Sequence, residues 1–221
     1  MFKRPLLIIP ILLLIIATIL LIFVNISGAS TGPLLDQLYW SRVTVTSGTV
    51  AWTNFRLCDL NSDTLVCDLS PQIAYPYVGL PIVEEFRDER STFFYLTRVS
   101  YFLLLAGVLF TVISLLAVVI SCICTVRVGS VFSSVFVGFT FFVTLAGASC
   151  VTAAHVKGVD AFNNDGFDSH IGVKMFAFVW SAVSCQLLSL LALIGLARHT
   201  RKNIQREKMS VSPPPQEVTY A

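Results

Sequence analysis

Cys58 and Cys67 are the residues of this chain whose type and spacing best suit a chemical reaction. They flank a polar stretch of Asp, Asn and Ser, whereas the other four cysteines lie in apolar surroundings. Two cysteines nine residues apart can close a small loop if they face an oxidising compartment. Such a bridge stabilises a fold by about 2–3 kcal/mol. We therefore predict a structural disulfide between them.

Other reactive residues show no spacing that indicates an active site. The three histidines, His155, His170 and His199, form no Cys/His/Asp spacing typical of zinc. The chain has no glycine-rich phosphate loop and no nucleophile elbow. We expect no enzyme activity, no metal, no cofactor and no nucleic-acid partner.

The elements that must position the cysteine pair belong to a membrane protein. Hydrophobic residues make up 55% of the 221 positions and charged residues 13%, and the mean hydropathy is +0.79. Four apolar runs have the ~20 residues needed to cross ~30 Å of hydrocarbon. They predict an all-α membrane protein with a four-helix transmembrane bundle, whose spans are 5–24, 101–123, 131–152 and 173–196.

Charge placement predicts the sides of the membrane. The head 1–4, the turn 124–130 and the tail 197–221 carry eight Lys and Arg against two acids, whereas the loops 25–100 and 153–172 carry the other eleven acids. Positive charge favours the cytoplasmic side, so we expect a multi-pass protein with both termini inside. The first span is predicted to be an uncleaved signal anchor. A cleaved signal peptide is the alternative, and it would leave the other sides unchanged.

The first half of the long outer loop, 25–100, is rich in β-forming residues. Val43-Thr-Val45-Thr and Thr49-Val-Ala-Trp52 predict a small antiparallel extracellular sheet, with an irregular loop as the alternative. In such a sheet the cysteine bridge would tie neighbouring strands together. Trp40 and Trp52 would supply its apolar core.

Apart from Lys174 at the start of 173–196, the spans themselves contain no Asp, Glu, Lys or Arg. Ion and proton pathways and polar-substrate transporters generally place such groups at membrane depth, so these functions are disfavoured. Gln186 is the notable polar residue there, and we expect it to form an interhelical hydrogen bond. Small residues recur at four-residue spacing in the last two spans, and they could pack helices within the bundle or between subunits. These repeats are Ser130, Ser134, Gly138, Ala146 and Cys150, then Ala177, Ser181, Cys185 and Ser189.

Four positions carry weak modification signals. Asn25-Ile-Ser27 is a glycosylation sequon, but it abuts the membrane, so an unmodified Asn25 is favoured. Cys122 and Cys124 lie near the inner end of the second span, where palmitoylation and buried free thiols explain them equally well. Ser212 precedes a proline in the tail and is a candidate phosphorylation site.

The expected partners are the lipid bilayer and neighbouring membrane proteins, through lateral homo- or hetero-association. A basic cluster opens the tail and would attract anionic inner-leaflet lipids, at about 1 kcal/mol per Lys or Arg. Ordinary stop-transfer charge explains the same cluster. Its members are Arg198, Arg201, Lys202, Arg206 and Lys208.

The layout of the chain resembles a known superfamily. The residues that carry the resemblance are Leu38-Tyr-Trp-Ser-Arg-Val-Thr, Ala51-Trp-Thr-Asn-Phe-Arg-Leu-Cys58, Cys67 and Ala74-Tyr-Pro-Tyr. With four spans and a long first outer loop they resemble the claudin-like superfamily. They are most similar to its fungal branch, which holds eisosome-associated plasma-membrane proteins and PalI-type pH-response proteins. The resemblance implies a left-handed four-helix bundle and a small extracellular sheet pinned by Cys58–Cys67, with Tyr75 and Pro76 in the structural core of the loop.

In function, the resemblance implies a non-enzymatic plasma-membrane protein that organises or stabilises a membrane domain. Such a domain would be eisosome-like and linked to the cell wall, endocytosis or stress responses. The alternative is an auxiliary subunit or sensor of the PalI type, which assists another membrane protein in ambient-pH signalling. The short tail favours the first of these, because PalI-type proteins usually have long tails.

Overall fold

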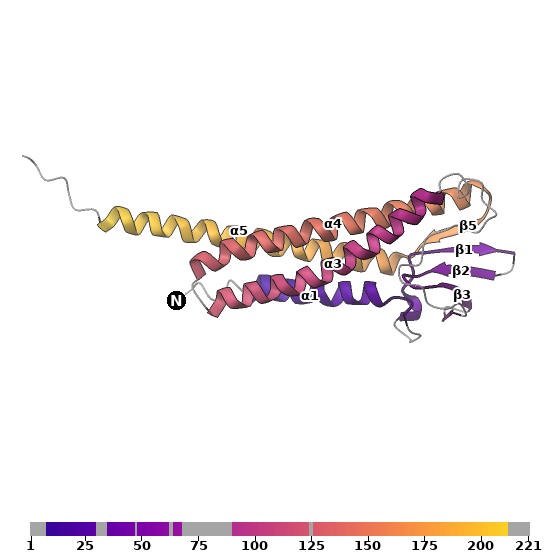
Figure 1. The fold of residues 1–221 in the computed structure, drawn as a ribbon, viewed down its shortest axis with the longest axis horizontal. Coiled ribbons are helices and arrows are strands. Elements are labelled where there is room, and N and C mark those ends of the chain that lie inside the picture. The colour runs from indigo at the N-terminus through magenta and orange to yellow at the C-terminus, as the bar shows by residue number, and fades with distance from the viewer. Residues whose placement is uncertain are drawn as a thin grey trace, which may run out of the picture.

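The computed structural model describes residues 8–29, 35–46, 48–61, 64–67, 90–123 and 126–211. Four long helices run side by side, and a small sheet lies at one end of them (Figure 1). The helices are α1 (Ile8–Ile26), α3 (Arg90–Ile123), α4 (Val126–Asn164) and α5 (Val173–Val211). The remaining elements are the 3-10 helix η2 (Leu35–Gln37) and the strands β1 (Ser41–Val45), β2 (Gly48–Trp52), β3 (Leu57–Asn61), β4 (Thr64–Val66) and β5 (Asp168–Ile171).

Each of the four helices contains a segment long and apolar enough to cross a membrane. The shortest, α1, rises ~28 Å over its length, which matches the ~30 Å of a hydrocarbon core. The predicted four-helix membrane fold is therefore confirmed. The candidate spans are Ile8–Ile26, Ser91–Ser121, Val131–Asn164 and Val173–His199.

Three helices extend beyond the predicted spans. Helix α3 begins at Arg90, inside the predicted loop 25–100, and α4 runs from Val126, inside the predicted turn, to Asn164, inside the predicted loop 153–172. Helix α5 continues to Val211, inside the predicted tail. On the sheet side these helices continue because the sheet offers them a second apolar surface, on which Phe93 of α3 and Phe162 of α4 are buried.

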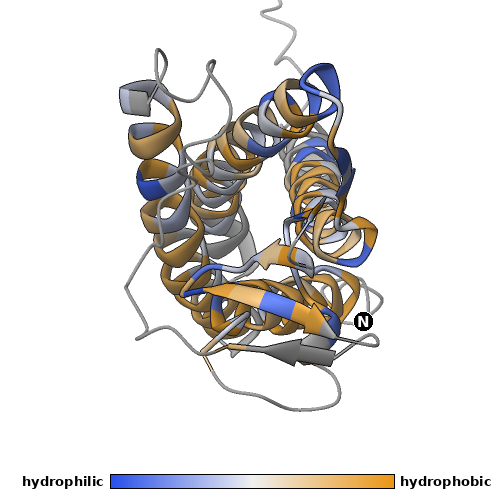
Figure 2. Cartoon of the chain, turned by 90° about the vertical axis from the view of Figure 1, so that its right-hand side faces the viewer, coloured by the Kyte–Doolittle hydropathy of each residue, from blue (hydrophilic) through white to orange (hydrophobic). Residues whose placement is uncertain are grey.

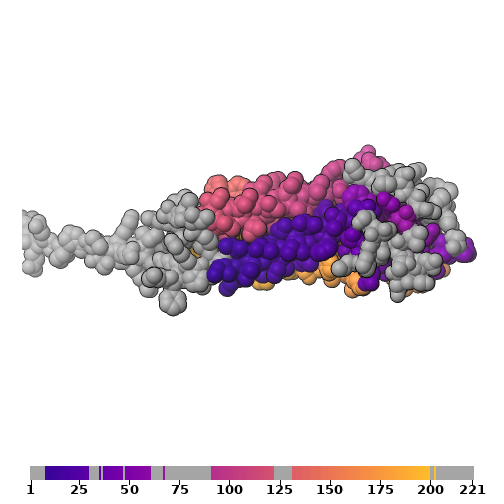
Figure 3. Space-filling view, turned by 90° about the horizontal axis from the view of Figure 1, so that it is seen from below, coloured from indigo at the N-terminus to yellow at the C-terminus, as the bar shows by residue number. Residues whose placement is uncertain are grey.

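Helix α1 lies between α3 and α5, as the space-filling view shows (Figure 3). Helix α4 packs against α3 and α5 and so completes the bundle. Seen from the sheet end of the molecule, the strands lie across the ends of the mostly apolar helices (Figure 2). Large apolar side chains such as Leu109, Phe142 and Leu188 are exposed on the outside of the bundle, where lipid would surround them.

Small hydroxyl pairs join α3 to α4 inside the bundle. Ser114 Oγ lies 2.9 Å from Thr140 Oγ1, and Ser121 Oγ lies 2.9 Å from Ser133 Oγ. Each of these pairs also carries a hydroxyl bond to a carbonyl one turn earlier in its own helix. The interior is therefore held by several similar, separate contacts.

Gln186 makes the expected interhelical hydrogen bond, because its Nε2 donates to Thr111 Oγ1 of α3 at 2.9 Å. Its Oε1 is buried and has no hydrogen-bond partner among the described residues. The small-residue repeats do not all point inward. Ala146, Ala177 and Ser181 are exposed on the surface of the bundle.

The sheet is antiparallel with the order β4-β3-β2-β1-β5, which confirms the predicted small sheet. Val43 pairs with Val50 across β1 and β2, and Arg42 pairs with His170 across β1 and β5. Strand β5 comes from the second predicted outer loop, where no sequence pattern indicated a strand. The sheet therefore joins the two predicted outer loops, 25–100 and 153–172.

The two faces of the sheet have different surroundings. Val43 and Trp52 point toward the helices and pack with Phe93 and Phe162. On the opposite face Ala51 and Cys58 form a smaller buried cluster, against which Tyr39, Leu60 and Cys67 pack.

Candidate functional site: the disulfide-pinned sheet and its junction with the helices

Cys58 and Cys67 form the predicted disulfide, with Cα atoms 4.3 Å apart. Cys58 lies on β3 opposite Ala51 of β2, and Cys67 directly follows β4. The bridge closes the β3–β4 hairpin on the sheet face against which Tyr39 packs, where Cys58 is buried and Cys67 is partly buried. It acts structurally, since it fixes the edge strand β4 to its neighbour β3.

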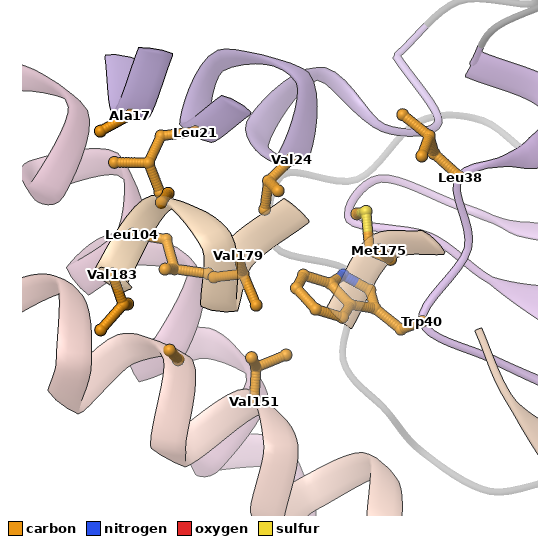
Figure 4. Packing of buried hydrophobic residues seen from close by; sticks show 12 residues of the cluster. Ala17, Leu21, Val24, Leu38, Trp40, Leu104, Val151, Met175, Val179 and Val183 are labelled. Carbon is orange, nitrogen blue, oxygen red and sulfur yellow. The ribbon is translucent and has the colours of Figure 1, made fainter. Parts of the chain in front are cut away.

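Trp40 is the residue through which the sheet meets the helices. Only 2% of its surface is exposed, and its ring stacks on His155 of α4 at 5.7 Å and meets Phe176 of α5 edge-on at 5.3 Å. In the close-up, the ring lies within the apolar cluster beside Met175 of α5 (Figure 4). The backbone of Trp40 accepts a hydrogen bond from Gly172 N at 2.8 Å and donates one to the Trp52 carbonyl at 2.8 Å.

Asn54 connects this tryptophan to α1. The indole Nε1 of Trp40 donates to Asn54 Oδ1 at 2.7 Å, and Asn54 Nδ2 donates to the carbonyl of Val24 at 2.5 Å. Ser27, just past α1, donates to the carbonyl of Leu38 at 2.6 Å. The end of α1 is therefore fixed to the loops of the sheet through two buried side chains.

Helix α4 is fixed to the sheet by two further polar contacts. Ser41 Oγ lies 2.9 Å from Nδ1 of the buried His155. Ser169 Oγ of β5, which has one proton to donate, lies 2.8 Å from the carbonyl oxygen of Val159 and 2.9 Å from Asn163 Oδ1, and the backbone N–H of Ser169 donates to Asn163 Oδ1 at 3.0 Å. The polar groups on this face of the sheet are thus used for contacts within the molecule.

Two glycines permit the close approach of backbone segments at the junction. A Cβ on Gly172 would lie 1.8 Å from the carbonyl oxygen of Tyr39. Gly28 has a φ of +77°, a conformation that L side chains rarely adopt, and a Cβ there would lie 2.0 Å from Thr53 Oγ1. No larger residue fits at either position without movement of the neighbouring strand segment.

Trp52 lies in the apolar cluster between the sheet and the helices, as the predicted sheet core requires. Its ring packs against Phe162 of α4, with ring centroids 5.7 Å apart. We name the contacts of Trp40, Asn54, Ser41 and His155, together with Gly172, the sheet–helix junction.

Sequence reasoning found the two tryptophans but missed their polar partners. Asn54 and Ser41 lie inside the stretches that carry the resemblance, which is the one signal that could have found them. For His155, no sequence pattern indicates its contact with Ser41. Among the described residues, no group of three or more His, Cys, Asp or Glu side chains could hold a metal ion.

Asn25 lies in the last turn of α1 and is buried. Its Nδ2, the atom that would carry a glycan, donates to the carbonyl of Leu21 at 2.8 Å. This arrangement supports the unmodified side chain.

Several predicted positions lie beyond what the structure describes. Arg198 and Lys202 of the basic cluster are exposed on α5. Tyr75, Pro76, Cys124 and Ser212 lie outside the described residues, as do the side chains of Cys122, Arg201, Arg206 and Lys208.

The chain is similar to several yeast proteins. It is 30% identical to Protein SUR7 of Candida albicans over 207 residues, which cover 86% of this chain and 74% of that protein. It is 28% identical to SUR7 family protein FMP45 of Saccharomyces cerevisiae, covering 85% of this chain and 65% of that protein. It is 26% identical to the uncharacterized plasma membrane protein YNL194C of the same yeast, covering 84% and 66% respectively. The chain thus spans about two thirds of the length of the two Saccharomyces proteins.

The model of the SUR7/PalI family matches residues 6–192, which include α1, α3, α4, α5 up to residue 192, the sheet and the disulfide. Together with the four candidate spans, this match shows that the chain is a membrane protein that belongs to the SUR7/PalI family.

Proposed function

We propose that this chain is a non-enzymatic plasma-membrane protein that organises or stabilises a lateral membrane domain. The domain would be eisosome-like and linked to the cell wall, endocytosis or stress responses. The observation that carries the proposal is the sheet–helix junction, in which the polar side chains of the sheet hold it onto the helices. A rigid unit of this kind suits a scaffold. The SUR7-named relatives and the relative described as a plasma membrane protein support the same role.

Lateral association of this unit would use the outer surface of α4 and α5. These helices are neighbours, and Ala146, Ala177 and Ser181 are exposed on them. Small residues allow a helix of another molecule to approach closely, and in lipid such packing replaces the hydrophobic effect as the driving force. This surface suits a second copy of the chain or another membrane protein.

The proposed orientation places the sheet outside the cell and both chain ends in the cytoplasm. Disulfides persist in oxidising compartments, and Cys58–Cys67 lies in the sheet. Helix α1 begins, and α5 ends, at the opposite end of the bundle (Figure 1). There Arg198 and Lys202 would attract anionic inner-leaflet lipids. Protease digestion of intact cells tests the orientation, because an epitope after residue 221 should stay protected.

The function is tested by fluorescence recovery after photobleaching of a tagged chain in fungal cells. The proposal predicts patchy, immobile fluorescence, and Ser181→Leu should make the patches recover faster because it blocks close helix approach. Leu109→Ile, on the exposed surface of α3, is the matched control and should leave recovery unchanged. Uniform, mobile fluorescence together with stoichiometric co-purification of one receptor or transporter would instead indicate the auxiliary role.

A further inference from the structure

A cavity of about 770 Å³ lies where β1 and β5 meet the beginning of α5. The residues that matter in its lining are Gln37, Tyr39, Arg42, His170, Val173 and Lys174. Figure 1 shows that β5 leads directly into α5 with β1 beside it. The antiparallel pairing sets Arg42 opposite His170, and the close approach at Gly172 brings the start of α5 against Tyr39. Lys174 Nζ donates a hydrogen bond to Gln37 Oε1, which fixes η2 to the first turn of α5.

The charge of this cavity is unbalanced. Arg42 and Lys174 are cations, and none of its described lining residues is an acid. His170 is paired with Asp168, at 3.0 Å, but no carboxylate among the described residues forms an ion pair with Arg42 or Lys174. Arg42 is half-buried. A half-buried guanidinium gains free energy from an anionic partner, and its planar fork suits the two oxygens of a phosphate.

The position of the cavity relative to the membrane restricts the ligand. The candidate span of α5 begins at Val173, which lines the cavity and has 77% of its surface exposed. One to two turns further along the same helix, Ala177 and Trp180 are also exposed. A ligand in the cavity therefore has water and charge on one side and an apolar helix surface on the other. Lys174 can keep its ammonium at the level of lipid headgroups while its stem lies against apolar surface.

We propose that this cavity binds the phosphate of an anionic lipid from the leaflet on the sheet side. In the proposed orientation this is the outer leaflet, so the lipid is distinct from the inner-leaflet lipids near Arg198 and Lys202. Arg42 and Lys174 bind the phosphate oxygens, and the start of α5 adds the partial positive charge of a helix N-terminus. The acyl chains lie along the exposed surface of α5 below Val173. This site goes beyond the proposed function, because it requires only the purified chain and a lipid, whether or not the protein organises a domain.

The test measures lipid binding to the full chain by native mass spectrometry. The chain is purified in detergent with phosphatidylcholine, and phosphatidylinositol is titrated in. We expect phosphatidylinositol adducts to form in preference to phosphatidylcholine adducts. Arg42→Gln and Lys174→Gln should each raise the apparent Kd of one adduct about tenfold, because each removes a charge-assisted contact to phosphate. Arg42→Lys, which keeps the charge but loses the fork, should have a smaller effect.

Arg98→Gln is the matched control. Arg98 is an exposed cation on α3, stacked over Phe94, and lies toward the sheet end of that helix. The Arg98→Gln variant should leave the Kd for phosphatidylinositol unchanged. A raised Kd in this variant would show that losing any cation weakens the general attraction of the chain for anionic lipid. Because Lys174 lies on an exposed helix turn, its variant stays informative even if the Arg42 variant folds poorly.

Two results would overturn the proposal. One is an unchanged Kd for phosphatidylinositol in a folded Lys174→Gln or Arg42→Gln chain. The other is tight binding of inorganic phosphate to the chain in a sample that contains phosphatidylcholine and no phosphatidylinositol. If its Kd equalled that of phosphatidylinositol, the ligand would be a soluble anion rather than a lipid.

Discussion

The interior of the helix bundle and the sheet–helix junction are held together in different ways. In the bundle, small hydroxyl pairs such as Ser114–Thr140 and Ser121–Ser133 repeat along two helices. At the junction, the single side chain of Trp40 contacts α4 and α5 directly and reaches α1 through Asn54. Loss of one bundle contact leaves similar ones in place, whereas loss of the Trp40 side chain removes contacts that reach three helices at once. The bundle should therefore tolerate single substitutions, and the junction should not.

Trp40→Ala should have the largest effect. Removing a buried aromatic side chain leaves a cavity and should lower the free energy of unfolding by about 3–5 kcal/mol. Thermal unfolding of the detergent-solubilised chain measures the loss. Trp180→Ala is the control, because Trp180 is 38% exposed and makes one hydrogen bond to Thr152, at 3.3 Å. An equal effect of the two variants would contradict the special role of the junction.

Gly172→Ala should rank second. Its new Cβ would overlap the carbonyl of Tyr39, so the strand segment must move, at a cost of about 3 kcal/mol. Gly195→Ala, in α5 with no atom near its added Cβ, should instead stabilise the helix by up to about 1 kcal/mol. Opposite signs in the same unfolding assay support the account, and a neutral Gly172→Ala would show that the contact is loose.

Cys58→Ser should cost about 2–3 kcal/mol, because it removes a cross-link that limits the unfolded chain. The sheet should then be less stable, and the protein should be retained in the secretory pathway. Surface labelling of cells measures delivery, with Cys185→Ser, a free cysteine of α5, as the control. Normal delivery of the Cys58→Ser chain would mean that the remaining sheet contacts suffice.

Gln186→Leu should have the smallest effect. Interhelical hydrogen bonds in membranes average about 0.6 kcal/mol, and here one amide oxygen is already without a partner among the described residues. We expect the free energy of unfolding to change by less than about 1 kcal/mol. A loss as large as that of Trp40→Ala would show that the bundle, too, depends on a single contact.

The same comparison explains what could be predicted from the sequence. Four spans follow from length and hydropathy, and β1 and β2 follow from local runs of β-forming residues. The disulfide follows from two close cysteines that flank a polar stretch. These are properties of short stretches. The two tryptophans could be assigned to the core because large buried aromatics have few other places in a small sheet.

The missed features depend on contacts between distant parts of the chain. Strand β5 consists of Asp168-Ser-His-Ile, which has a single β-branched residue and forms a strand because it pairs with β1. Helix α4 extends to Asn164 because Phe162 finds a partner in Trp52. No spacing in the sequence indicates that His155 meets Ser41, which lies 114 positions earlier.

The central claim is that the sheet and the helices form one unit joined at Trp40. Hydrogen–deuterium exchange of the full chain in lipid nanodiscs tests it most directly. The amide of Trp40, which donates to the Trp52 carbonyl, and the amide of Gly172, which donates to the Trp40 carbonyl, should exchange slowly in the unaltered chain. In Trp40→Ala, protection should fall together in β1, in β5 and at the end of α1 near Val24, while the centres of α3 and α4 stay protected. If β1 alone became exposed while β5 and α1 kept their protection, the sheet would be an independent appendage and the claim would be wrong.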